Sequence, residues 1–266
     1  MFRTFYLSRR VMHKIQYGFN AIHEGLWLGI LKSKKLRELS DYHYQASGDS
    51  DGYDDRDWNL SGLHRWETVV VDQYFSECKT VLLGAAGGGR EIVALSKKGI
   101  RVDGFECCRS LMESCRQLLS SLGITSEVIY AEPDTVPDQF GVYDGLIMGW
   151  GSYAHIIGQK QRVQLLTDFR QHVQPGGPLL LSFFTRTRDS AGFRLTTGLA
   201  NFIRRISGAE LIEVGDRLTT DFRHFFLESE IREELNKAGF DLQFYSTKPY
   251  GHAIAVRSMD IMEDVE

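Results

Sequence analysis

The sequence has few of the features that mark secreted, metal-binding or disulfide-linked proteins. It contains four cysteines, Cys78, Cys107, Cys108 and Cys115, and no two of them form a Cys-x-x-Cys pair. No histidine lies at zinc-ligand spacing from them, which argues against a disulfide framework and against a metal site. We therefore expect buried, reduced thiols, no bound metal, and a cytoplasmic protein.

Long apolar runs and an excess of positive charge are missing as well. No window approaches the roughly 20 apolar residues of a membrane-spanning helix. The stretch FNAIHEGLWLGIL is interrupted by His23 and Glu24, which argues against a secretory signal. The formal net charge is -4 and the sequence pI is about 6.1. The chain thus lacks the basic footprint of a nucleic-acid binder, and we expect no nucleic-acid partner.

The N-terminal 40 residues combine an apolar stripe with a local excess of positive charge. Apolar residues recur at helical spacing from Val11 to Ile30, which predicts one long helix over residues 9–39 or two helices broken near Gly25. Gly18, Gly25 and Gly29 are candidate close-approach points. The segment holds eight Lys or Arg against two acids. Such a helix can lie on an anionic membrane surface, or its stripe can pack on the domain or on a second copy of the protein.

An acidic, loop-like stretch follows at residues 41–59, DYHYQASGDSDGYDDRDWN, with six aspartates and one arginine. Its glycines and serines predict a mobile connector, and Tyr42, Tyr44 and Trp58 have the surface needed to cover a ligand. We therefore assign residues 1–60 to an N-terminal helix and a lid-like connector. Residues 61–257 form the main domain, and residues 258–266 form an acidic tail.

From residue 80 onward, strands and helices are predicted to alternate. Short unalternating apolar runs at 80–85, 100–105, 126–130, 143–149 and 178–184 are typical of strands buried on both faces. Helical patterns fall between them at 90–98, 109–121 and 159–173. The pattern predicts a doubly wound, mostly parallel α/β sheet that binds ligands at the carboxyl ends of its strands. The stretch DLQFYSTKPYGHAIAVR predicts a closing antiparallel hairpin.

The loop GAAGGGREI connects the first of these strands to a helix that begins near Arg90. Backbone N–H groups at the start of a helix can face a ligand, and small side chains let that ligand approach. Tight strand-to-helix turns also need glycine without any ligand, so the loop alone is not specific. Glu106 ends the second strand, seventeen residues after Gly89. A carboxylate there can accept hydrogen bonds from a ribose diol, or it is a solvated strand-end glutamate.

Several elements in this order resemble the class I S-adenosylmethionine-dependent methyltransferases of the small-molecule type, over residues 64–257. They are the loop Ala85–Gly89, Glu106, AEPDTVP after the third strand, YDGLIMGWGSYAHI at the fourth, and Pro175-Gly176-Gly177 before the fifth. The Tyr-x-x-x-Lys pair of the short-chain dehydrogenases is absent. The resemblance implies a methyltransferase with S-adenosylmethionine as cofactor. It also implies a mostly parallel seven-stranded sheet with the C-terminal hairpin, beside the N-terminal helical segment.

The resemblance also implies a set of cofactor-binding residues. They are Ala85, Ala86, Gly87, Gly89, Glu106, Cys107, Glu132, Pro133, Gly149 and Trp150. Glu106 would take the ribose hydroxyls and Glu132 the adenine amino group. Two positions depart from the family, because Leu83 replaces a common acidic residue and Ala85 replaces the first loop glycine. A common anchor near the methionine amino group is therefore missing.

His155, just after the fourth strand, is the implied catalytic residue, because a histidine there can take a hydroxyl proton near neutral pH. The alternative is a hydrogen-bonded structural histidine. The implied substrate residues are Tyr44, Tyr153, Arg186, Arg223 and His224. The last three fall in an insertion at about 186–226 that would form a substrate cap. We expect Arg204 and Arg205, in the same insertion, on a solvated helix face.

The function that follows is methyl transfer to a small hydroxylated or amino acceptor of natural-product or sugar type, with O-methylation favoured. Two other readings stay open. Leu83 and the altered loop are compatible with a module that binds the cofactor without catalysis, and the basic N-terminal helix is compatible with RNA methylation. Trp66 and Glu67 are expected either to cover the adenosine or to lie in the core.

Overall fold

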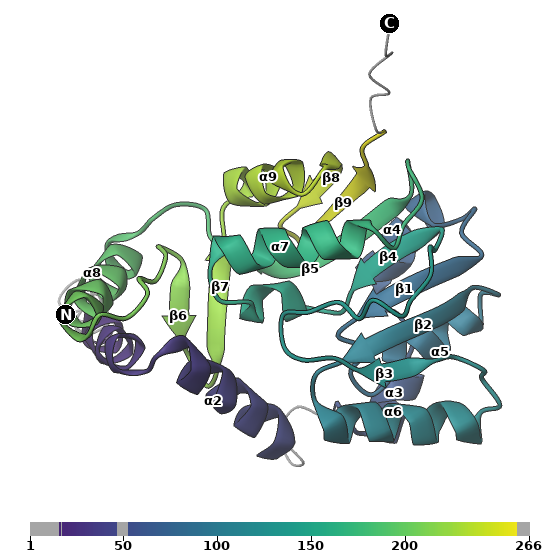
Figure 1. The fold of residues 1–266 in the computed structure, drawn as a ribbon, viewed down its shortest axis with the longest axis horizontal. Coiled ribbons are helices and arrows are strands. Elements are labelled where there is room, and N and C mark those ends of the chain that lie inside the picture. The colour runs from purple at the N-terminus through teal and green to yellow at the C-terminus, as the bar shows by residue number, and fades with distance from the viewer. Residues whose placement is uncertain (1–15, 17, 47–52, 260–266) are drawn as a thin grey trace, which may run out of the picture. The chain divides into compact units, whose positions relative to one another are not determined.

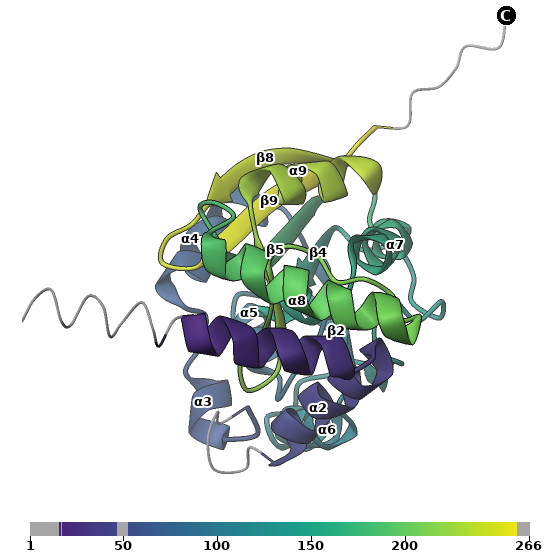
Figure 2. The same ribbon diagram turned by 90° about the vertical axis from the view of Figure 1, so that its left-hand side faces the viewer.

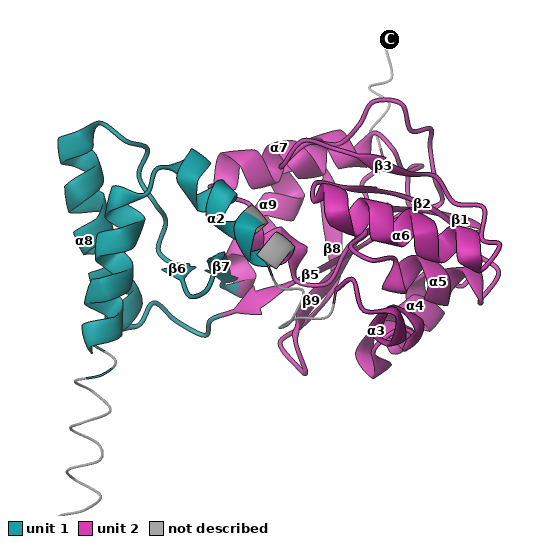
Figure 3. Ribbon diagram, turned by 90° about the horizontal axis from the view of Figure 1, so that it is seen from below, with its two compact units in different colours: residues 1–43, 186–227 teal, residues 44–185, 228–266 magenta. Residues whose placement is uncertain are grey.

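The computed structural model describes residues 16, 18–46 and 53–259, and the chain divides into two compact units (Figure 3). The smaller unit contains residues 1–43 and 186–227, and the larger unit contains residues 44–185 and 228–266. The N-terminal segment and the insertion, which lie far apart in the sequence, therefore belong to one unit. None of the described helices is long and apolar enough to span a membrane.

The larger unit is built on a sheet whose described strands run in the order β3-β2-β1-β4-β5-β9-β8 (Figure 1). Five of them pair in parallel: β1 (Thr80–Gly84), β2 (Arg101–Glu106), β3 (Val128–Tyr130), β4 (Gly145–Met148) and β5 (Pro178–Thr185). β9 (Gly251–Arg257) is antiparallel to β5 and to β8 (Phe240–Ser246). The predicted parallel sheet and its C-terminal hairpin are confirmed.

Helices cover both faces of this sheet, as the alternating pattern predicted. On one face, α4 (Arg65–Tyr74), α5 (Arg90–Ser96) and α6 (Arg109–Ser121) form a common core with β1, in which Val81 and Leu83 are fully buried. On the other face, α7 (Gln159–Arg170) sets Phe169 edge-on against Phe105 of β2, with ring centroids 5.8 Å apart. β2 and β4 flank β1, so the strand order reverses at β1 and the carboxyl ends of β1 and β4 border the switch point.

In the smaller unit, residues 18–30 form a helix that runs through Gly25 and ends before α2 (Ser33–Ala46). Neither sequence alternative, one long helix or two helices broken near Gly25, matches, because the break lies at Leu31 and Lys32. Gly25 instead packs against α8 (Ala191–Ser207): a Cβ atom there would lie 2.9 Å from the carbonyl oxygen of Thr196. A Cβ at Gly29 would lie 2.8 Å from Cβ of Ile203. Both are close-approach points, as predicted, whereas Gly18 has no such neighbour.

Arg204 corrects a second expectation, because it lies in the interior of the smaller unit with 1% of its surface exposed. Its guanidinium donates to three backbone carbonyl oxygens, those of Leu28 and Leu31 at 2.7 and 2.6 Å and that of Glu210 at 2.6 Å. It thereby satisfies carbonyl groups at the end of the 18–30 helix, which have no partner within the helix. Arg205 is exposed, as expected.

The acidic connector is more ordered than its composition predicts, within the part that the structure describes. α2 continues to Ala46, and α3 (Arg56–Leu60) begins at an N-cap where Asp55 accepts a hydrogen bond from the N–H of Trp58 at 2.7 Å. Aspartate is a favoured N-cap residue, so one of the six acids promotes a helix. Residues 47–52 and the tail from 260 lie outside the described residues. Cys107 is exposed, in contrast to the buried Cys78, Cys108 and Cys115.

The smaller unit also contains an antiparallel strand pair, β6 (Asp216–Leu218) and β7 (Phe222–Phe226). Arg217 of β6 forms an ion pair with Glu24 of the 18–30 helix. The unit is therefore held together by polar contacts between its N-terminal and insertion segments, as well as by the close packing of Gly25 and Gly29 on α8.

Candidate functional site

The three consecutive glycines of the β1–α5 loop are needed for three different reasons. Gly87 has φ +53°, and a Cβ there would meet nothing within 4 Å, so open space lies beside the backbone. Gly89 has φ +99° and forms the N-cap of α5. A Cβ at Gly88 would lie 2.1 Å from the carbonyl oxygen of Tyr53 and 2.3 Å from Nδ2 of Asn59. The connector therefore packs directly on the glycine loop.

Replacing Gly88 with alanine is expected to lower the free energy of unfolding by about 1–3 kcal/mol, the usual cost of overpacking. One of the clashing atoms belongs to the backbone and cannot rotate away. Urea denaturation of Gly88→Ala measures the loss, and Gly141→Ala is the matched control because a Cβ there meets nothing within 4 Å. Equal stability of the two variants would show that the connector does not pack on the loop.

Glu106 lies at the tip of β2 and binds the glycine loop. Its Oε2 accepts a hydrogen bond from the N–H of Gly87 at 2.8 Å, and its Oε1 accepts one from the N–H of Cys108 at 2.8 Å. Burial raises the pKa of this carboxyl, and the backbone hydrogen bonds act in the opposite direction. Each carboxylate oxygen has two lone pairs and can accept a further hydrogen bond from a hydroxyl group. The predicted ribose ligand thus has a suitable, preoriented acceptor.

The other predicted cofactor residues at this edge follow β2 and β3. These strands pair in parallel with Glu106 opposite Tyr130, so Cys107 and Glu132 emerge from adjacent strand tips. Glu132 is exposed, and its backbone carbonyl accepts hydrogen bonds from Thr135 at 3.2 and 2.7 Å. Pro133, next to it, is half-buried. The structure therefore brings these three residues to the same edge of the sheet as Glu106.

The tips of β1 and β4 touch at Gly149. Its N–H donates to the carbonyl oxygen of Gly84 at 2.8 Å, and a Cβ would lie 2.2 Å from the carbonyl oxygen of Ala85. Ala85 itself has φ +55°, which is uncommon for a residue other than glycine. Trp150 follows with its ring 5.7 Å from that of His64 and 5.2 Å from that of Tyr250. Trp150 is accordingly a packed aromatic wall at the switch point.

His155 and Tyr44, which are 111 residues apart in the sequence, are hydrogen-bonded in the structure. The hydroxyl oxygen of Tyr44 lies 3.0 Å from Nε2 of His155, and the two rings meet edge to face. Both side chains are half-buried. The sequence assigned them separate roles, catalysis and substrate contact, and did not predict that they meet.

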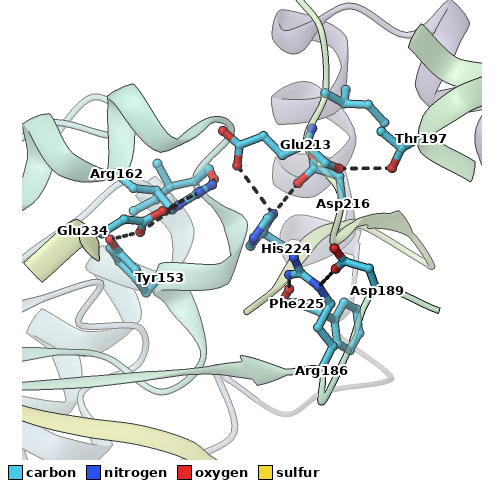
Figure 4. Close-up of polar contacts among 12 residues, drawn as sticks. Tyr153, Arg162, Arg186, Asp189, Thr197, Glu213, Asp216, His224, Phe225 and Glu234 are labelled. Carbon is cyan, nitrogen blue, oxygen red and sulfur yellow. Dashed lines mark hydrogen bonds and ion pairs between the residues drawn. The ribbon is translucent and has the colours of Figure 1, made fainter. Parts of the chain in front are cut away.

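A buried ion pair holds the short helix η1 (Ser152–His155) that carries His155 (Figure 4). The hydroxyl of Tyr153 donates to Oε2 of Glu234 at 2.6 Å, and Nη2 of Arg162 donates to Oε1 of Glu234 at 2.7 Å. All three side chains have at most 1% of their surface exposed. The structure thus places Tyr153, a predicted substrate residue, in the interior, where it orients the segment that carries His155.

The remaining predicted substrate residues lie in the smaller unit and are engaged in its own contacts. Arg186 is buried, and its Nε donates to Asp189 at 2.9 Å. Arg223 donates from Nε to Oδ1 of Asp221 at 2.7 Å. A Cβ at Gly215 would lie within 3 Å of both Arg186 and His224, which shows how closely these two side chains approach this backbone.

His224 is fully buried and, with Glu213 and Asp216, forms a group of potential metal ligands whose donor atoms lie within 4.8 Å of one another (Figure 4). Nδ1 of His224 lies 2.6 Å from Oδ1 of Asp216. The second oxygen of Asp216 accepts a hydrogen bond from the N–H of Glu213 at 2.8 Å. Asp216 of β6 thus contacts both His224 of β7 and the backbone of Glu213, and this cluster links the two strands.

Sequence reasoning missed a buried charge network at the start of α5, directly after the glycine loop. Arg90 donates to both oxygens of Glu67 at 2.7 and 2.8 Å and to Glu91 at 2.6 Å. Burial raises the pKa of Glu91. Trp66 lies in the core, with its ring 4.5 Å from that of His252. An arginine at the first position of a helix, where acids are favoured, was the available signal for this network.

No protein-family model matches this sequence, and no curated protein matches it. Solved structures do resemble it. A SAM-dependent methyltransferase from Methanosarcina mazei has a TM-score of 0.57 and 18% identity, covering 75% of this chain and all of its own. CalS10, an amino pentose methyltransferase from Micromonospora echinaspora, has a TM-score of 0.54 and 13% identity, covering 82% and 96%.

A third similar structure is the 1,6-didemethyltoxoflavin-N1-methyltransferase of Burkholderia thailandensis. It has a TM-score of 0.55 and 16% identity, and the match covers 84% of this chain and 86% of that one. At such identities the likeness concerns the fold. The chain therefore has the Rossmann-like fold found in S-adenosylmethionine-dependent methyltransferases.

Proposed function

We propose that this chain, which has the fold of the S-adenosylmethionine-dependent methyltransferases, transfers a methyl group from that cofactor to a small hydroxylated or amino acceptor. The observation that carries the proposal is the contact of Glu106 with Gly87. It places a buried carboxylate beside an open glycine backbone at the edge where β1 and β4 meet. Ligands of doubly wound sheets bind at this edge.

The residues present fit the cofactor. Glu106 would accept the ribose hydroxyls, and Glu132 at the tip of β3 would accept the adenine amino group. The backbone at Ala85, Gly87 and Gly149 would line the remainder, with Trp150 as a wall. The bound cofactor would supply a methyl group on a positively charged sulfur, which reacts by in-line displacement.

His155 would hold the proton that a hydroxyl acceptor loses. Its Nε2 is bonded to the hydroxyl of Tyr44, so a proton can reach the imidazole directly or through that hydroxyl. General-base catalysis of this kind contributes roughly 10²–10⁴-fold. An amine acceptor that arrives uncharged needs no base to attack. The His155–Tyr44 pair therefore supports O-methylation, because only a hydroxyl acceptor needs a base to remove its proton.

Two of the similar proteins are methyltransferases of small molecules, an amino pentose and 1,6-didemethyltoxoflavin. They support a natural-product or sugar acceptor for this chain. The packing of Tyr53 and Asn59 on Gly88 supports a role for the connector at the site. A cap formed by residues 186–226 stays a prediction.

Calorimetric titration with S-adenosylmethionine and with S-adenosylhomocysteine tests the proposal, and we expect both to bind. Absence of binding at millimolar ligand would refute it. Small hydroxylated and amino compounds are then screened for methylation, with His155→Ala as the comparison. A hydroxyl acceptor should lose most of its turnover in this variant, whereas an amine acceptor should retain it.

A cofactor-binding module without catalysis is the second candidate, and Leu83 favours it. The Leu83 side chain of β1 is fully buried in the core and carries no polar atom, so it cannot anchor the methionine amino group. The module would bind both ligands in the titration and yield no methylated product. One robust product excludes it.

A further inference from the structure

Two helices of the smaller unit, residues 18–30 and α8, pack side by side in a parallel arrangement (Figure 2). Gly25 contacts Thr196 and Leu199, and four residues later Gly29 contacts Ala200 and Ile203. The hydroxyl of Thr196 also donates to the carbonyl oxygen of Ala21 at 3.1 Å. The glycines bring the helices close enough to form one continuous surface.

We call the line of contact between the two helices, formed by Ala21, Gly25 and Gly29 on the first helix, the seam. The pair exposes large apolar side chains on one side of it. In the first helix, Ile22, Leu26 and Ile30 each follow a seam residue by one position. In α8, Leu195 and Phe202 each precede one. In parallel helices these positions lie on the same side of the contact line. The contacting sides of the two helices face each other, so one residue forward along the first helix and one residue back along the second, about 100° each, turn toward the same side. The two stripes therefore merge.

We call this surface the two-helix face. It consists of Phe19, Ile22, Leu26, Ile30, Leu195, Phe202 and Ile206, which are 41–75% exposed. Single exposed apolar residues are normal on protein surfaces, whereas a contiguous patch of this kind marks an interaction site.

Charge distribution identifies the partner. Glu24, the acid of the 18–30 helix, is buried and paired with Arg217, and α8 contains no acid. Arg194 and Arg205 of α8 are exposed, and Lys32 and Lys34 follow the first helix on exposed positions. In sequence, Arg9, Arg10 and Lys14 also precede the helix. Within residues 18–35 and α8 the exposed charged side chains are therefore all basic, and the nearest exposed acids, Glu38 of α2 and Glu210 after α8, lie outside these two segments.

A second copy of the chain is a poor match for such a face. A twofold dimer through it would place the same surface against itself, so its arginines and lysines would meet no acid of the two helices. An anionic lipid surface supplies both the apolar layer and the negative charge. Because no described helix can span a bilayer, the helices would lie in the interface plane.

We propose that the two-helix face binds the surface of an anionic membrane. Phe19, Leu26 and Phe202 enter the headgroup region, and the basic residues contact lipid phosphates. Membrane binding on this face is independent of the proposed methyl transfer, because none of its residues belongs to the cofactor site. It would bring the protein to acceptors that are made or held at a membrane.

Vesicle flotation with the full-length protein tests this binding. We expect the protein to float with vesicles of phosphatidylcholine and phosphatidylglycerol, to float far less with phosphatidylcholine alone, and to be released by high salt. The double variant Phe202→Glu, Ile206→Glu should bind the vesicles at least about tenfold more weakly, since it places negative charge in the apolar layer. Both residues are exposed, so the fold should persist.

The matched control is Val69→Glu, Val142→Glu, which adds the same charge at exposed apolar positions of the larger unit. It should bind vesicles as the unmodified chain does. Equal loss in both double variants would trace the effect to net charge and overturn the assignment to this face. No vesicle binding by the unmodified chain would overturn the proposal. So would a dimer, measured by light scattering, that only the Phe202→Glu, Ile206→Glu variant dissociates.

Discussion

Replacing Glu234 with alanine is expected to lower the free energy of unfolding by about 3–5 kcal/mol, the usual cost of breaking a buried ion pair. The variant leaves the guanidinium of Arg162 without its carboxylate at a position that is 1% exposed. It also removes the acceptor of the Tyr153 hydroxyl. Urea denaturation, followed by circular dichroism, measures the loss.

Glu233 provides the control, because it is the adjacent residue on α9 (Glu228–Lys237) and forms an exposed pair with Lys237. Glu233→Ala should change stability by about 0.5 kcal/mol or less, as expected for an exposed pair four residues apart on a helix. A double variant, Arg162→Met with Glu234→Leu, should recover much of the stability, because two apolar residues replace two buried charges. If Glu234→Ala is as mild as Glu233→Ala, the buried pair contributes little.

Replacing Glu106 with glutamine is expected to weaken the binding of S-adenosylhomocysteine by about 10²–10⁴-fold. Two charge-assisted hydrogen bonds to the ribose would be lost, each worth roughly 1.5–3 kcal/mol. The amide also cannot accept from the N–H groups of Gly87 and Cys108 on both of its ends. Calorimetry measures the affinity without requiring a known acceptor.

Glu113→Gln is the matched control, since Glu113 is exposed on α6 and is not one of the proposed cofactor residues, so the affinity should be unchanged. The pH dependence gives an independent check. Burial raises the pKa of Glu106, and the ribose hydroxyls bind its ionised form, so affinity should fall as the pH is lowered toward that pKa. Glu106→Gln should lack this part of the pH dependence. An unchanged affinity in Glu106→Gln would show that this carboxylate does not hold the ribose.

The sequence predicted the framework of the larger unit. The strands from β1 to β5, the helices α5, α6 and α7 and the closing hairpin lie where the apolar runs and helical spacing placed them. Strands buried on both faces need unbroken apolar runs, and a helix covering one face needs an apolar stripe. These requirements are local, so they can be read from one stretch of chain. The glycine loop and Glu106 follow from the same order of elements.

The tertiary structure decided every feature that depends on residues far apart in the chain. The sequence left open a helix break near Gly25 and predicted a solvated position for Arg204. Gly25 instead supports close packing of two helices, and the Arg204 guanidinium binds the carbonyl oxygens of Leu28 and Leu31, 176 and 173 residues earlier in the chain. The Tyr44–His155 hydrogen bond likewise spans 111 residues. Burial and partners depend on what another segment brings to a position, and neither spacing nor composition records that.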